Sequence, residues 1–129
     1  MLKRGGRLYL LDGHPSMLVM EEESGQLVHK YPWRTDPKSP MHFDEEITYT
    51  GEAMPEEASG SYDWAHPLSA IIVSLLNEGL RLDFLHEHEK VSWRYVNLMV
   101  PDKDEPRMYR LPDNLPTLPL SFSLGATKH

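Results

Sequence analysis

Three stretches of the chain have the apolar spacing of β-strands, and one has that of an α-helix. The first is the apolar run at residues 8–11, which follows Gly5 and Gly6 and ends in the turn-forming residues 12–15. A short apolar run between turn residues is typical of a strand buried on both faces, as in a parallel sheet. We therefore predict a strand at residues 8–11 that needs cover on both sides.

The predicted helix lies within residues 66–80, where apolar residues recur at helical spacing: Leu68, Ile71, Ile72, Leu75 and Leu76. Pro67 suits the first helical position, because its missing N–H is not needed there. Gly79 suits the left-handed residue that commonly ends a helix. We expect a helix of about three turns whose apolar stripe belongs to the core.

Two more strands are predicted after this helix. Residues 81–89 alternate, so that one face would carry Leu82, Phe84, His86 and His88 and the other Asp83, Leu85 and Glu87. Residues 118–128 alternate with a regular period of two, which places Leu118, Leu120, Phe122, Leu124 and Ala126 on one face. A helix directly between two strands implies a parallel crossover. One helix covers one face of such a sheet, whereas residues 8–11 require cover on two.

The remaining segments are predicted to be mostly irregular. Residues 45–51 alternate and residues 60–64 are a second extended piece, so an antiparallel hairpin is expected there. Residues 16–23 suggest a short helical turn, and residues 24–42 read as irregular because glycine and proline interrupt them. Residues 90–117 form a long proline-rich loop.

Composition narrows the possible functions. A chain of 129 residues suggests one domain. A net charge of −7 makes nucleic acid and anionic membranes poor partners. The chain has no cysteine, which excludes disulfides, thiolate zinc sites and cysteine nucleophiles. We find no apolar run long enough to span a membrane and no signal peptide pattern, so we expect a cytoplasmic protein.

The ordered set of segments resembles the carboxyl-terminal half of a class I S-adenosylmethionine-dependent methyltransferase of the small-molecule type. The resemblance rests on LKRGGRLYLLDGHP at 2–15, YDWAHPLSAIIVSLLNEGLRLDFLHEHE at 62–89 and RLPDNLPTLPLSFSLGATK at 110–128. It covers nearly the whole chain and is loosest at residues 20–60. The sequence departs from the family in one detail, Arg4, where proline is frequent.

The resemblance implies an α/β fold: a partial Rossmann-like methyltransferase domain over residues 1–129, with a mixed sheet, an antiparallel last strand and an added antiparallel hairpin. Residues 7–12 would be strand five, 67–78 the crossover helix, 81–88 strand six and 118–127 the last strand, inserted antiparallel between strands five and six. Residues 15–62, with the hairpin, and the long loop 90–117 would cover the substrate side.

The resemblance also implies a part of the fold that these residues do not supply. The family binds S-adenosylmethionine with a glycine-rich turn after strand one and an acidic residue at the end of strand two. The only candidates here are Gly5–Gly6, Gly51 and residues 59–61, and none is expected between a strand and a helix. Methyl transfer to a small-molecule acceptor is therefore expected only with a complementary N-terminal half, and no cofactor-binding residue is assigned in this chain.

A second hypothesis is a non-catalytic interaction or dimerisation module. A strand edge without its neighbour recruits other strands. We therefore expect either a homo-oligomer or a complex with the complementary half.

Five residues are candidates for the site. His14 and Asp12 follow the first strand, at the end that faces the ligand crevice in open α/β sheets. His14 would act as a general base and Asp12 as a substrate-side group, unless both serve only the turn. His66 is the second catalytic candidate, and the resemblance places Tyr62 and Trp64 beside the substrate. The alternative is that His66 caps the helix and Trp64 belongs to the core.

Residues 86–89, His-Glu-His-Glu, invite comparison with a metal site, since imidazoles two apart on a strand share a face. No third ligand is fixed by the spacing, and we assign no metal site.

Overall fold

A computed structural model of the chain describes residues 1–43 and 61–129. Its elements are β1 (Arg7–Gly13), α1 (Pro15–Leu18), β2 (Met20–Glu23), β3 (Gln26–His29), β4 (Met41–Phe43), β5 (Ser61–Asp63), α2 (Leu68–Asn77), β6 (Leu80–His88), β7 (Val100–Pro101), β8 (Tyr109–Arg110) and β9 (Ser121–Lys128). Helix and strand are mixed, and the strands pair antiparallel in several small sheets. No helix in the described ranges is both long enough and apolar enough to cross a membrane.

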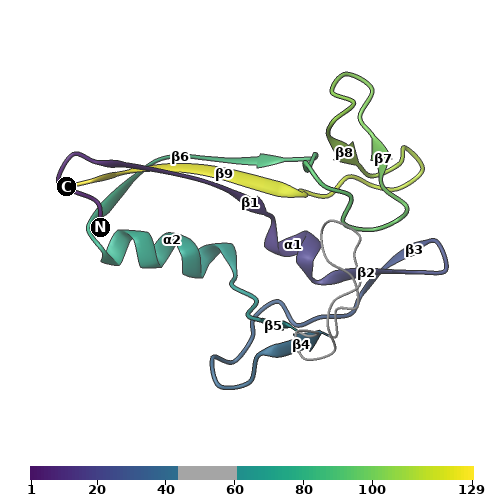
Figure 1. Ribbon diagram of the computed structural model, residues 1–129, viewed down its shortest axis with the longest axis horizontal. Helices are drawn as coiled ribbons and strands as arrows, with labels where there is room; N and C mark the ends of the chain where they lie inside the picture. Colours follow the sequence, from purple (N-terminus) through teal and green to yellow (C-terminus); the bar gives the residue numbers. More distant parts are fainter. Residues whose placement is uncertain (44–60) are drawn as a thin grey trace.

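The largest sheet has three strands in the order β1-β9-β6 (Figure 1). β9 runs antiparallel to both neighbours, so β1 and β6 run in the same direction. The antiparallel insertion of the last strand between the strands at residues 7–12 and 81–88, which the resemblance implies, is thereby confirmed. The connection from β1 to β6 passes through α2, as the sequence predicts for a crossover.

The two faces of this sheet differ in their cover. Phe122, Leu124 and Ala126 share one face of β9 and are almost completely buried. On the opposite face Tyr9 and Leu11 of β1 are 64% and 57% exposed. That face is open at Tyr9 and Leu11 but covered at Ser121 and Ser123, which are buried. We place α2, which lies along one side of the sheet, over the face of Leu124 (Figure 1). The expectation that residues 8–11 are buried on both faces is therefore wrong for the described residues.

α2 has the bounds that its pattern predicts, to within one residue. Pro67 occupies the capping position rather than the first helical one. Gly79 has a φ of 76°, the left-handed conformation expected of it. The prediction that the apolar stripe is core is wrong, because no residue of α2 is buried and Leu76 is 51% exposed. The helix packs against β6, and Val73 and Leu76 remain half exposed.

The side chains of β6 depart from the strict alternation predicted for residues 81–89. The register of β6 against β9 shifts between Leu82 and Phe84. This β-bulge turns Leu82 to the face that also carries Leu85, while Phe84, His86 and His88 keep the other face. At the bulge the ring of Phe84 lies so close to Gly125 that any Cβ there would collide with it.

Two antiparallel ribbons lie between α1 and α2 among the described residues. The helical turn predicted for residues 16–23 is confined to α1, and β2 occupies residues 20–23 of that segment. β2 and β3 form a hairpin around Ser24 and Gly25, which both have positive φ. Ser-Gly is a turn signal that the sequence offered at this place. β4 pairs with β5, so an antiparallel ribbon ending near Asp63 exists. The predicted first strand of that hairpin, 45–51, lies outside the described residues.

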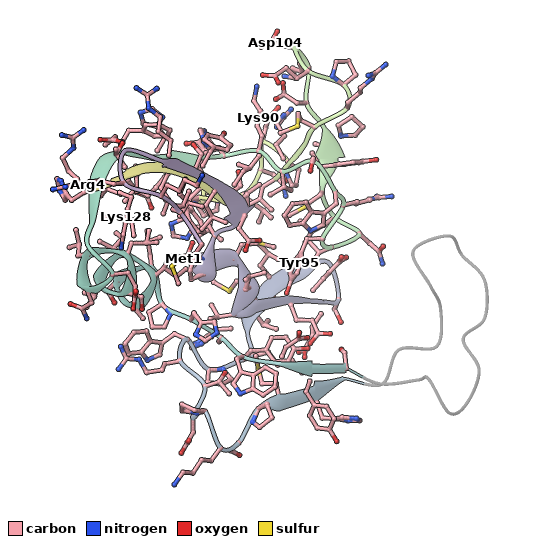
Figure 2. The ribbon with its side chains drawn as sticks, turned by 60° about the vertical axis from the view of Figure 1, so that its left-hand side comes forward. Met1, Arg4, Lys90, Tyr95, Asp104 and Lys128 are labelled. Atoms are coloured by element: carbon pink, nitrogen blue, oxygen red, sulfur yellow. The ribbon has the colours of Figure 1, made fainter. Side chains whose placement is uncertain are left out.

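A second hydrophobic cluster lies beyond the carboxyl ends of β1 and β6, at the opposite end of the sheet from the chain termini (Figure 1). Its buried members are Met17, Val91, Val96, Met99, Leu111 and Leu120. Figure 2 shows the same division, with Arg4 and Lys128 at one end and Lys90 and Asp104 at the other. The segment predicted as a long loop, 90–117, thus contributes β7, β8 and much of this cluster.

Candidate functional site

The carboxyl ends of β1 and β6 meet at a histidine whose two ring nitrogens are both engaged. His14 caps α1, and its Nδ1 accepts the Ser16 N–H at 3.0 Å. Because Nδ1 accepts, Nε2 carries the proton and donates to Glu87 Oε2 at 2.5 Å. The Ser16 hydroxyl lies 2.8 Å from Nδ1 and also donates to the Pro119 carbonyl at 3.1 Å.

This network joins three parts of the fold. His14 follows β1, Glu87 belongs to β6, and Pro119 precedes β9. The His14 ring is buried and meets Phe122 edge-on, with 6.2 Å between ring centroids. The side chain that sequence reasoning offered as a general base therefore has no ring nitrogen left for a substrate. Its partners Glu87 and Ser16 were not among the sequence candidates. Glu87 lies 73 positions away, which hides the contact, and Ser16 lies two positions away, where its role as a partner becomes visible only in the structure.

The other candidates lie apart from this network. Asp12 is exposed, and its Oδ1 accepts the Gly13 N–H at 2.7 Å. This contact agrees with the alternative that Asp12 serves the turn after the first strand. His66 is exposed on the segment before α2. Within residues 1–43 and 61–129 no hydrogen bond or ring contact links His66 to His14.

Tyr62 and Trp64 form an exposed aromatic surface on the ribbon of β4 and β5. Tyr62 stands opposite His42, with 4.8 Å between the ring centroids. The indole N–H of Trp64 donates to the Pro37 carbonyl at 3.2 Å. Trp64 is not core, because almost half of its surface is exposed. These rings remain available for contact with a ligand.

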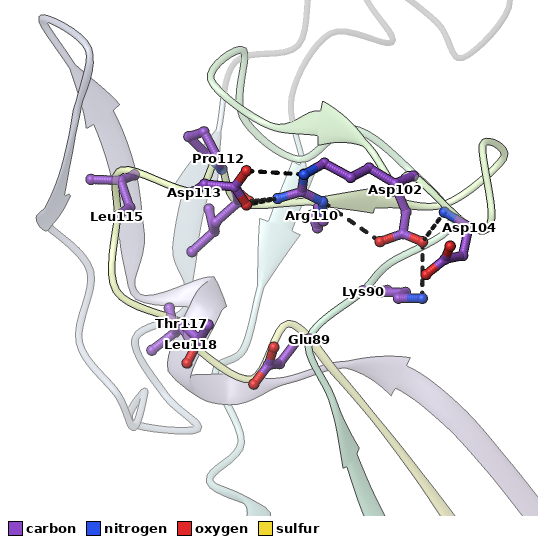
Figure 3. A pocket seen from close by; sticks show the side chains of 12 residues that line it. Glu89, Lys90, Asp102, Asp104, Arg110, Pro112, Asp113, Leu115, Thr117 and Leu118 are labelled. Carbon is purple, nitrogen blue, oxygen red and sulfur yellow. Dashed lines mark hydrogen bonds and ion pairs between the residues drawn. The ribbon is translucent and has the colours of Figure 1, made fainter.

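A charged site lies in residues 90–117, which extend beyond the end of the sheet and are called the lobe below (Figure 3). Asp102 is buried, and its carboxylate contacts Lys90 Nζ at 3.0 Å and Arg110 Nε at 3.6 Å. The same carboxylate accepts the backbone N–H groups of Asp104 and Glu105. It borders a cavity of about 340 Å³. The hydrogen bond from Lys90 is the largest cause that lowers the pKa of Asp102.

A pH dependence follows for Asp102. A carboxyl group whose pKa is lowered by folding contributes stability above its unfolded pKa of about 3.9, and this contribution is lost as the pH falls through the folded value. We expect Asp102→Asn to be less stable than the wild type at pH 7, with the difference shrinking steadily on acidification below about pH 4. Urea unfolding from pH 7 to pH 2.5 measures it. Asp104→Asn, at the exposed neighbour, is the control and should follow the wild type; a constant deficit for Asp102→Asn would contradict the assignment.

A second polar cavity, of about 360 Å³, lies between β2 and residues 95–97. The Tyr31 hydroxyl donates to Glu21 Oε2 at 2.6 Å, and this bond raises the pKa of Tyr31. Glu22 Oε2 accepts the Leu98 N–H at 3.0 Å and so ties the hairpin to the lobe. The glutamates at 21–22, which look like a solvated run in the sequence, thus have internal partners.

The described residues contain no group of three or more histidine, aspartate and glutamate side chains placed to hold a metal ion. In residues 86–88 the histidines have other contacts: the ring of His86 stacks on Phe84, and His88 Nε2 lies 2.8 Å from Ser123 Oγ.

The strand-to-helix turns do not fit the cofactor that the resemblance implies. The turn from β1 to α1 has one glycine, Gly13, and the space beside it is filled by Trp93 and Leu18. The turn before α2 consists of residues 64–67 and has no glycine. Gly5 and Gly6 precede β1, and Gly5 N donates to Lys128 O. The candidates at 51 and 59–60 lie outside the described residues.

Comparison with known proteins gave no match: no family model, no curated protein and no solved structure matched the chain.

Proposed function

We propose that the chain is the carboxyl-terminal half of a class I S-adenosylmethionine-dependent methyltransferase acting on a small molecule. One observation carries the proposal. β1 and β6 run in the same direction, are connected through α2, and are separated by the antiparallel β9. This is the strand order that the sequence resemblance implies for strands five, six and the last strand of the partial Rossmann-like fold.

Exposed surfaces on the sheet and on α2 support the same proposal. The edge of β1 is open, and the outer side of α2 is bare within the described residues. A half-domain that joins β1 and covers these surfaces would bury residues such as Tyr9 and Leu76. The cofactor site would belong to that half, because neither strand-to-helix turn among residues 1–43 and 61–129 offers a glycine with free space beside it.

In this proposal the other half binds the cofactor, and the present chain binds the methyl acceptor. The lobe and the β4–β5 ribbon lie at the carboxyl end of β1 and β6, where open α/β sheets bind ligands. The exposed rings of Tyr62 and Trp64 would contact the acceptor, and positioning is the main contribution that such a surface makes to transfer. Asp12 and His66 stay candidates for contacts to the acceptor. In this proposal His14 orients the loop beyond β1 through Glu87 and Ser16. The protein would act in the cytoplasm.

The coding DNA upstream of Met1 tests the proposal. We expect it to encode a strand followed by a glycine-rich turn and a helix, with an acidic residue ending the next strand, either in frame or as a neighbouring gene. A fully sequenced neighbourhood without such a segment would contradict the proposal.

A second candidate function is a non-catalytic interaction module. The observation that favours it is the outer edge of β1, which pairs with no described strand and carries two exposed apolar side chains. Exposed apolar strand edges recruit other strands. This candidate needs no cofactor, so binding of S-adenosylmethionine by a completed protein separates the two.

A further inference from the structure

The outer edge of β1 presents a defined set of backbone groups. Lys128 N donates to Gly6 O, and His14 N donates to Leu120 O, so the even-numbered residues of β1 hydrogen-bond to β9. In an antiparallel pair, bonded and non-bonded residues alternate. The N–H and C=O groups of the odd-numbered residues therefore point away from β9. These residues are Arg7, Tyr9, Leu11 and Gly13.

One of these donors is already used, since Gly13 N donates to the carboxylate of its neighbour Asp12. Arg7, Tyr9 and Leu11 remain, and no described strand pairs with them. β1 contains no proline and no lysine, the residues that most often block edge pairing, and Arg7 is the one charged residue among its three outward-facing positions. Arg7, Tyr9 and Leu11 provide three sites for ladder hydrogen bonds.

We propose that this edge pairs antiparallel with the β1 edge of a second copy of the chain, centred on Tyr9. A two-fold axis perpendicular to the sheet keeps each face on the same side, so Tyr9 stands opposite Tyr9 and Arg7 opposite Leu11. This register uses the outward N–H and C=O groups of Arg7, Tyr9 and Leu11 and leaves Gly13 outside. The two three-stranded sheets become one continuous sheet of six strands.

The charges at the two ends of β1 favour antiparallel over parallel pairing with a second copy of the chain. β1 begins at Arg7, just after Lys3 and Arg4, and ends beside Asp12. Antiparallel pairing brings the basic beginning of one strand to the acidic end of the other, whereas a parallel pair would place like charges together. With a net charge of −7 per chain, self-association needs such local complementarity.

The inference stands on the geometry of the edge and does not require methyl transfer. It does have a consequence for the proposed half-domain. A strand supplied by another chain would use the same edge, so self-pairing and completion would exclude one another.

Single-cysteine variants test the register, since the chain has no cysteine of its own. Opposed residues in a hydrogen-bonded antiparallel pair have Cα atoms about 5.5 Å apart, within disulfide range. Under mild oxidation Tyr9→Cys should form a covalent dimer, and Leu11→Cys should not, because the two copies of residue 11 lie four residues apart along the ladder. Equal cross-linking of both variants, or none with Tyr9→Cys, would overturn the register.

Sedimentation of the 129-residue chain tests the pairing itself. We expect a concentration-dependent dimer for the wild type. Leu11→Pro removes an N–H that points outward, leaves the bonds to β9 intact, and should give a monomer with an unchanged circular dichroism spectrum. Val73→Lys, on the exposed side of α2, is the control and should remain dimeric. A monomeric wild type, or a dimer that survives Leu11→Pro, would overturn the proposal, as would a foreign protein bound to the edge in place of the second copy.

Discussion

Replacing Leu124 by alanine is expected to lower the free energy of unfolding by about 3 kcal/mol. Leu124 is fully buried, at 0% exposure, in the central strand of the sheet. It stands between Leu10 of β1 and Leu85 of β6, so the substitution opens a cavity shared by all three strands. The cost combines the lost transfer free energy with the cavity term. Urea unfolding followed by circular dichroism measures it.

Leu76→Ala is the matched control, because it deletes the same atoms from a leucine that is half exposed on α2. We expect a loss below about 1 kcal/mol. Comparing the two losses in the free energy of unfolding locates the core. We expect the core on the sheet face that carries Leu124 and not along the apolar stripe of α2. Equal losses for the two variants would show that the helix stripe is buried in solution, as it would be if another chain covered it.

Replacing His14 by alanine should cost about 2 kcal/mol. The substitution removes the cap of α1, worth about 1 kcal/mol, and the hydrogen bonds to Ser16 and Glu87. Glu87 is itself half exposed and can regain water, which keeps the loss moderate. Because the network ties β1, β6 and the segment before β9, the lobe should lose order together with α1.

His66→Ala is the control for His14→Ala, since both histidines are catalytic candidates on sequence grounds. His66 is exposed, so its removal should change the free energy of unfolding by no more than about 0.5 kcal/mol. Equally small changes in the free energy of unfolding for the two variants would show that His14 does not stabilise the fold. His14 would then again be a candidate general base.

The sheet could be predicted from the sequence because its signals are local. The period of two in residues 118–128 and the helical spacing between Pro67 and Gly79 each identify one element without knowledge of the rest. The order of the strands came from the resemblance, which implied the insertion of the last strand. The bulge beside Phe84 could not be predicted, since it is a shift in the pairing of two strands that lie far apart in the sequence.

The lobe was missed for the opposite reason: its cluster joins residues far apart in the chain, such as Met17, Val91 and Leu120. Met17 and Val91 sit in segments with no period of their own, and the alternation around Leu120 does not show which residues pack against it. The partners of His14 were missed likewise, since 73 positions separate it from Glu87. One local signal was available for the lobe, because Asp102 followed by residues 103–106 has the composition of a turn in which the aspartate side chain accepts backbone N–H groups.

The central claim is that these residues are the acceptor-binding half of a methyltransferase whose cofactor site is supplied by a further segment. Calorimetric titration with S-adenosylmethionine tests it most directly, with the 129-residue chain alone and with the chain co-expressed with the segment encoded upstream. We predict no binding to the chain alone and saturable one-to-one binding to the completed protein. Micromolar binding to the chain alone, or no binding to the completed protein, would contradict the claim.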